Sequence, residues 1–208
     1  MIVKLINIDW RVAMSSFKER KIAKKKEEIL RSAATVFAEK GYHGTTMEEV
    51  AAKLLMTKGS MYYYFKNKDD LLYHCHQMIM DKSIGKMTEI INSPTTPTSK
   101  LENAIKAHIH LATSEKSMFM VMDKPNQHFT DEYLREILDS RTKYAQYFDQ
   151  ILQEGIDKGE FKPIDIKMIR MIILGALNWI QEWYDPQGEK TGEEISEAFA
   201  MYLLRMVL

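Results

Sequence analysis

The side chains best suited to chemistry fall in residues 58–65, Lys-Gly-Ser-Met-Tyr-Tyr-Tyr-Phe. Met61 and Phe65 lie four residues apart, so a short helix here would bury both on one side. Lysine, hydroxyl and phenol groups then remain on the outer side, where they suit phosphate oxygens and base edges in a DNA groove. The outward-facing residues are Lys58, Ser60, Tyr62 and Tyr63.

The histidines and the single cysteine do not have the spacing of a metal site. On a helix, the neighbours in His74-Cys75-His76 point about 100° apart and cannot all face one ion. His108 and His110 have the same problem, and no two histidines show the i, i+4 spacing of helical metal sites. The sequence contains no Gly-rich phosphate loop and no nucleophile elbow. It therefore predicts no metal and no cofactor, and it argues against an enzyme.

The elements around residues 58–65 carry strong helix-start signals. Thr46 and Glu49 form the Thr-x-x-Glu pattern of a capping box, so a helix should begin there. A turn over 55–57 follows, and Thr57 and Asn67 are suited to cap the next two helices. The apolar face of the first of these helices contains Met47, Val50, Ala51 and Leu54.

The charge is distributed unevenly, although the net charge is zero. Residues 1–68 hold 14 Lys and Arg against 7 Asp and Glu, and the remainder holds 15 against 22. A basic first part favours a polyanionic partner, and the alternative is a solvated basic helix. We expect a first helix from Lys18 or Lys24 to Lys40, ended by Gly41. Its Lys24-Lys25-Lys26 run could reach phosphates or form a solvated first turn.

The bulk composition predicts an all-α protein outside the membrane. Hydrophobic residues make up 45% and charged residues 28%, with five prolines and no alternating β pattern. No apolar run approaches the roughly 20 residues that span a bilayer. The lone Cys75 fits a reducing cytoplasm. Residues 1–15 look like a flexible extension with a second plausible start at Met14, followed by a small domain over 16–68 and a larger one over 69–208.

The segment from Glu28 to Leu72 resembles the N-terminal helix-turn-helix domain of the TetR family of bacterial transcriptional regulators. The resemblance rests on Ala33, Phe37, Gly41, Tyr42, Thr45-Thr46, residues 58–65 and Asn67-Lys68. It implies phosphate contacts for Thr46 and Lys68. It places Lys58, Gly59, Ser60, Tyr62 and Tyr63 against the DNA groove, with Lys58 and Ser60 contacting the bases. It does not decide whether Tyr64 faces the groove or packs inward. The family often has Gly where this chain has Leu55, which predicts a different turn geometry.

The larger domain is expected to contain helices over 69–91, 99–114, 118–122, 131–158, 164–184 and 192–206. The helix over 164–184 is apolar around much of its circumference and needs cover on more than one side. The family usually dimerises through two such C-terminal helices, and the alternative is a central core helix. The expected interface residues are Ile172, Gly175, Ala176, Trp179, Phe199, Tyr202 and Met206.

Helices of the larger domain also supply candidates for a ligand pocket. Fifteen methionines suit an adaptable apolar cavity. The expected lining residues are His108, Phe119, Met122, Tyr144, Tyr147, Phe148, Trp179 and Trp183.

The stretch from Leu174 to Tyr184 is similar to members of the family that respond to acyl-CoA thioesters. The resemblance implies a repressor that binds a pseudo-palindromic, double-stranded operator as a homodimer and is released by a small hydrophobic effector. An acyl-CoA or a fatty acid is the expected effector. A drug-responsive efflux repressor and a ligand-binding protein without DNA binding are the alternatives.

Overall fold

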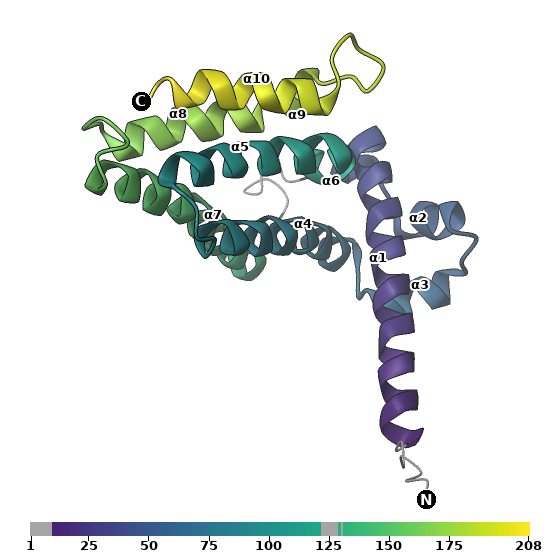
Figure 1. The fold of residues 1–208 in the computed structure, drawn as a ribbon. Helices are drawn as coiled ribbons and strands as arrows, with labels where there is room; N and C mark the ends of the chain where they lie inside the picture. Colours follow the sequence, from purple (N-terminus) through teal and green to yellow (C-terminus); the bar gives the residue numbers. More distant parts are fainter. Residues whose placement is uncertain (1–9, 122–128, 130) are drawn as a thin grey trace, which may run out of the picture.

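The computed structural model describes residues 10–121, 129 and 131–208, and every regular element within them is an α-helix. The predicted all-α class is therefore confirmed. A small domain contains α1, α2 and α3, and α4 leads from it into a larger helical domain (Figure 1). The helices are α1 Trp10–Gly44, α2 Met47–Lys53, α3 Lys58–Tyr64, α4 Lys68–Ile91, α5 Pro97–Ser114, α6 Lys116–Met120, α7 Asp131–Asp157, α8 Ile166–Asn178, α9 Ile180–Trp183 and α10 Gly192–Leu204.

The predicted caps position the small domain. The Thr46 side chain accepts from the Glu49 N–H, and the Glu49 carboxylate accepts from the Thr46 N–H, which completes the capping box. Thr57 and Asn67 cap α3 and α4 in the same way, each accepting from a backbone N–H three residues on. Gly41 has φ 72°, so the regular part of α1 ends just before it, as expected.

Several boundaries differ from the expected ones. α1 begins at Trp10, and so it includes residues 10–15 that were expected in a flexible extension; residues 1–9 lie outside the described part. The expected single helix over 164–184 is divided at Trp179. There the Glu182 N–H bonds to the Trp179 carbonyl three residues back, which changes the hydrogen-bond register. α5 starts two residues before the expected residue 99, because Thr96 caps it and proline is tolerated in a first turn.

Two hydrophobic cores share α4. The first half of α4, with Leu71, Cys75 and Ile79, packs in the core of the small domain. Its second half, with Met87 and Ile90, packs in the core of the larger domain. The boundary between the two cores thus falls inside α4, beyond the predicted domain boundary at residue 68, because the two halves of this continuous helix pack in different cores.

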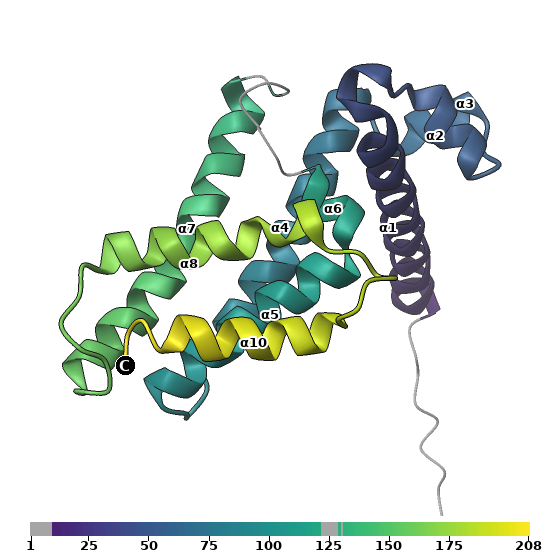
Figure 2. The ribbon, with the colours of Figure 1, turned by 90° about the horizontal axis from the view of Figure 1, so that it is seen from above.

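The larger domain is layered. α8 and α10 lie side by side in both views, α10 packs on α5, and α7 packs on α4 and α5 (Figures 1 and 2). The short α6 lies against α1, so the larger domain contacts the small one through α6 as well as α4. None of the described helices combines the length and the apolar composition needed to cross a bilayer.

Candidate nucleic-acid interface and ligand cavity

The short helix α3 presents an almost fully exposed surface. Met61 is its one buried residue, and Phe65 is buried just after its end. Tyr62 is 43% and Tyr63 is 70% exposed, although both are large aromatic residues. Tyr64 is half-buried and packs against the core, so it belongs to the interior more than to the surface. The other exposed residues of α3 are Lys58, Gly59 and Ser60.

Lys58 is held by neighbours on this surface. Its ammonium lies 2.5 Å from the Glu48 carboxylate of α2 and 5.8 Å from the centre of the Tyr62 ring. The hydrogen bond between the two side chains raises the pKa of Lys58 and lowers that of Glu48. Glu48 therefore competes for Lys58 with any phosphate or base that Lys58 binds.

The two residues expected at phosphates have structural partners already. Thr46 is exposed, with its hydroxyl engaged in the capping box. The Lys68 ammonium donates to the Tyr42 carbonyl at 2.9 Å and lies 4.2 Å from the centre of the Tyr42 ring. An ammonium has three N–H donors, so this contact leaves others for a phosphate. Lys68 thus ties the start of α4 to the end of α1.

Leu55 occupies the turn between α2 and α3 with φ 53°, and its side chain is 97% exposed. Leu55 itself adopts the left-handed conformation, which glycine takes readily and leucine avoids. The different turn geometry expected from the absence of glycine stays a prediction. The backbone closes the turn around it, and the Met56 N–H bonds to the Ala51 carbonyl.

A cavity of about 210 Å³ lies among six helices of the larger domain, α4 to α9. Three of the predicted lining residues, His108, Phe119 and Tyr144, do line it. Six residues absent from the prediction complete it: Met80, Ser83, Arg141, Leu174, Asn178 and Gln181.

The other predicted lining residues lie elsewhere. Phe148 is fully buried in the core, and Tyr147 bonds through its hydroxyl to Thr88. Trp179 and Trp183 are 64% and 46% exposed, on the outer face of the α8–α9 segment that also carries Ile172 and Gly175. Met122 lies outside the described residues.

The polar part of the cavity lining was not predicted from the sequence. Leu174, Asn178 and Gln181 follow one another at i, i+4 and i+7 on the α8–α9 segment, so they share one face. Two uncharged amides on the same face as Leu174 were a signal that the sequence contained.

The cavity chemistry centres on a neutral pair. His108 Nδ1 lies 2.9 Å from the Tyr144 hydroxyl. Burial lowers the pKa of His108 to about 4 and raises that of Tyr144, so both are uncharged at neutral pH. The other ring nitrogen, His108 Nε2, is buried without a hydrogen-bond partner among the described residues. Arg141 is the charged residue of the lining.

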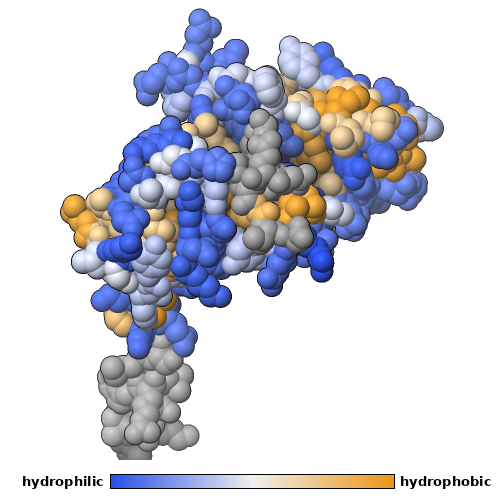
Figure 3. Space-filling model, turned by 180° about the vertical axis from the view of Figure 1, so that it is seen from behind, coloured by the Kyte–Doolittle hydropathy of each residue, from blue (hydrophilic) through white to orange (hydrophobic). Residues whose placement is uncertain are grey.

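A third feature is an exposed apolar face on α8, α9 and α10. Met171 is 58%, Trp179 is 64% and Tyr202 is 60% exposed. Figure 3 shows hydrophobic residues gathered at the upper right, over the layer that α8 and α10 form. Of the predicted interface residues, Ile172, Gly175, Trp179 and Tyr202 are exposed, whereas Ala176, Phe199 and Met206 are half-buried and pack against the core.

The fold and these features define a two-domain helix-turn-helix protein. A family model described as "Bacterial regulatory proteins, tetR family" matches residues 29–75. A second, described as "Tetracyclin repressor-like, C-terminal domain", matches residues 94–207, which is more than half of the chain. The chain therefore belongs to the TetR family, a family of DNA-binding transcriptional regulators.

Similar proteins include two curated repressors or regulators. The chain is 25% identical to the HTH-type transcriptional repressor KstR2 of Mycolicibacterium smegmatis, over 88% of this chain and 90% of that protein. It is 30% identical to the fatty acid metabolism regulator protein of Bacillus subtilis, over 73% and 78% of the two chains. Among solved structures, AibR in complex with isovaleryl coenzyme A and operator DNA is 25% identical, with a TM-score of 0.75 and coverage of 88% and 97%.

Proposed function

We propose that this protein is a ligand-responsive repressor that binds a pseudo-palindromic operator as a homodimer and leaves it when a small effector binds. The observation that supports the proposal most is the surface of α3, where Lys58, Ser60, Tyr62 and Tyr63 are all exposed beside a capped helix start. Exposed phenols next to a lysine suit phosphates and base edges.

The apolar face on α8–α10 supports a dimer. Trp183 stacks on Phe199 with ring centres 6.2 Å apart, which joins α9 and α10 into one surface. Large exposed apolar patches on a water-soluble fold mark interaction sites. A two-fold dimer through this face would present two α3 helices to two half-sites, with the distance between them fixed by the dimer.

The cavity supports a compact effector. An apolar cavity of about 150 Å³ holds one benzene ring, so 210 Å³ suits a moiety of roughly six to ten non-hydrogen atoms. The fatty acid regulator and the isovaleryl-CoA complex among the similar proteins favour an acyl-CoA or a fatty acid. The polar lining favours a short acyl group with a hydrogen-bonding function over a long saturated chain. No carboxylate lines the described part of the cavity, which disfavours a cationic drug.

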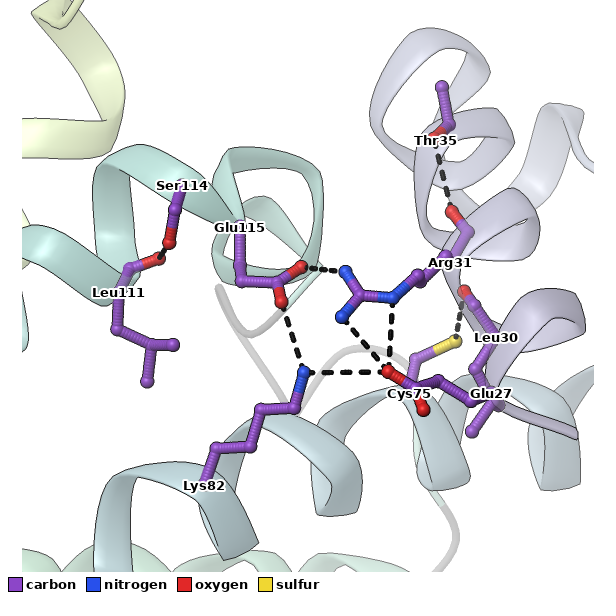
Figure 4. A network of polar contacts seen from close by, with 9 residues as sticks. All are labelled: Glu27, Leu30, Arg31, Thr35, Cys75, Lys82, Leu111, Ser114 and Glu115. Carbon is purple, nitrogen blue, oxygen red and sulfur yellow. Dashed lines mark hydrogen bonds and ion pairs between the residues drawn. The ribbon is translucent and has the colours of Figure 1, made fainter. Parts of the chain in front are cut away.

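One residue touches both the cavity and the small domain. Phe119 of α6 lines the cavity and also packs in the core that holds Val36, Phe37 and Met61. A polar network beside it joins α6 to α1 and α4 (Figure 4). An effector that moves Phe119 would thus shift α6 against α1. A coupling of only about 1–3 kcal/mol would suffice for a repressor.

The test is a binding titration on DNA from the upstream region of the protein's own gene. We expect a specific shift that acyl-CoAs of graded length reverse, shorter chains acting at lower concentration. K58Q should relax sequence preference. K68Q should weaken all duplexes about equally and lower the salt slope by about one unit. A protein that binds no duplex above the non-specific level would contradict the proposal.

A further inference from the structure

The N-terminal half of α1 carries a row of lysines beside α3. α1 is 35 residues long and runs past α3 towards the N-terminus of the chain (Figure 1). Lys18, Lys21, Lys24 and Lys25 line one surface groove with Tyr63 and Tyr64 of α3, and its volume is about 550 Å³. We call these four lysines the basic ridge.

Most lysines of the basic ridge have no carboxylate partner among the described residues. Glu28 is the carboxylate of the groove, and it pairs with Lys25 at 3.0 Å. In the part of the chain that the structure describes, Lys18, Lys21 and Lys24 have no carboxylate within ion-pair distance. Three nearby lysines differ, because Lys40 pairs with Glu49, Lys53 with Glu39 and Lys58 with Glu48.

The spacing of the ridge suits a phosphate backbone. Lys18, Lys21 and Lys24 follow at i, i+3 and i+6, so they form a row along one side of α1. At a rise of 1.5 Å per residue this row is about 9 Å long. Phosphates of one DNA strand follow every 3.4 Å along the duplex axis, so the row spans about three of them.

We propose that the basic ridge binds the phosphate backbone of the duplex that flanks the half-site read by α3. This inference rests on the proposed function, since it extends the same DNA contact. Tyr63 connects the two surfaces, because it is 70% exposed on α3 and lines the groove of the ridge. The phosphates beyond the edge of the half-site therefore meet three uncompensated lysines. Such contacts strengthen binding without regard to sequence.

The experiment compares two duplexes, both containing the operator identified for the wild-type protein. One ends at the outer edges of the half-sites, and the other continues on each side by about one helical turn. Binding is measured by fluorescence anisotropy over a range of salt concentrations, for wild type and for K18Q/K21Q/K24Q. The matched control is K143Q/K162Q/K167Q, which removes three exposed lysines of the larger domain.

We expect the wild type to bind the longer duplex with a salt slope steeper by about two to three units than on the short one. K18Q/K21Q/K24Q should abolish that difference and bind the short duplex as the wild type does, with sequence preference kept. The control should behave as the wild type on both duplexes. Equal thermal midpoints for the three proteins would exclude a folding defect.

Two results would contradict the proposed role of the basic ridge in DNA binding while leaving the repressor proposal intact. In one, the wild type binds the operator specifically with the same slope on both duplexes. In the other, the triple variant loses binding to vesicles of anionic lipid and keeps the wild-type slope on DNA, which would make the ridge a membrane contact. A wild type without specific binding to any duplex would instead overturn the proposed function, and the ridge proposal with it.

Discussion

The Arg31 guanidinium of α1 donates a hydrogen bond to the Glu115 carboxylate at the start of α6, across 84 positions of sequence. Lys82 of α4 donates to the other Glu115 oxygen at 3.0 Å, and Arg31 also bonds Glu27 at 3.0 Å (Figure 4). Burial raises the pKa of Glu115, but the bonds from Arg31 and Lys82 outweigh it and leave the pKa lowered. The carboxylate is therefore charged where α1, α4 and α6 meet.

Replacing Arg31 should weaken the communication between the domains. The Glu115 side chain is only 13% exposed, and R31Q removes one of the two cations that the structure places beside it, leaving Lys82. We expect a loss of about 1 kcal/mol in stability. We also expect about a fivefold smaller effect of the effector on the dissociation constant for operator DNA. Paired titrations with and without effector measure that ratio.

The control for R31Q is K86Q on α4, which breaks the exposed pair with Glu89 at 2.9 Å. It should change neither stability nor the effector ratio, because exposed pairs contribute little. An R31Q protein with the wild-type ratio would show that α6 communicates by packing alone.

Removing the carboxylate that holds Lys58 should tighten DNA binding. Glu48 is a negative charge on the surface proposed to meet phosphates, and it competes with them for Lys58. We expect E48Q to bind operator about three- to tenfold more tightly at low salt, with the gain shrinking as salt rises. Anisotropy titrations at several salt concentrations measure this. E39Q, which breaks the Lys53 pair on α1, is the matched control, and an equal gain there would indicate a general charge effect.

Relieving the turn at Leu55 should stabilise the small domain. A non-glycine residue in the left-handed conformation costs about 1 kcal/mol, and the exposed side chain makes no packing contribution that its removal would lose. We expect L55G to raise the thermal midpoint by a few degrees, and L55N to raise it less. L55A keeps the Cβ atom and should leave the midpoint nearly unchanged. A lower midpoint for L55G would mean that Leu55 has a partner in solution.

Stability should fall as the pH drops below about 6.5. Burial lowers the pKa of His108 to about 4, and burial with the charge of Arg141 lowers that of His76 to about 3. Between pH 6.5 and 4 the unfolded chain binds protons that the folded protein does not, so acid favours unfolding. Each histidine should contribute about 1 kcal/mol per pH unit.

Urea unfolding from pH 7.5 to 5 measures this dependence. H108Q should start less stable, because it loses the contact with Tyr144, but its stability should fall less steeply. The exposed H110Q is the control and should follow the wild-type slope. An unchanged slope in H108Q would mean that His108 is protonated in the folded protein.

Local signals determined the small domain. The Thr46–Glu49 box, the caps Thr57 and Asn67, and the Met61–Phe65 pair each act within four residues, so the sequence predicted their structure correctly. The helical class and the positive φ of Gly41 follow in the same way. The left-handed conformation of Leu55 did not follow, because closure of the turn between two packed helices overrides the preference of a single residue.

The tertiary structure alone decided what the larger domain encloses. Apolar periodicity marks a buried face but does not say whether that face meets core, cavity or a second subunit. Phe148 and Trp179 are both large aromatic residues on predicted helices, yet Phe148 lies in the core and Trp179 is exposed, because packing of the neighbouring helices decides which face is covered. The link from Arg31 to Glu115 likewise exists only after folding, since it depends on how α6 packs against α1.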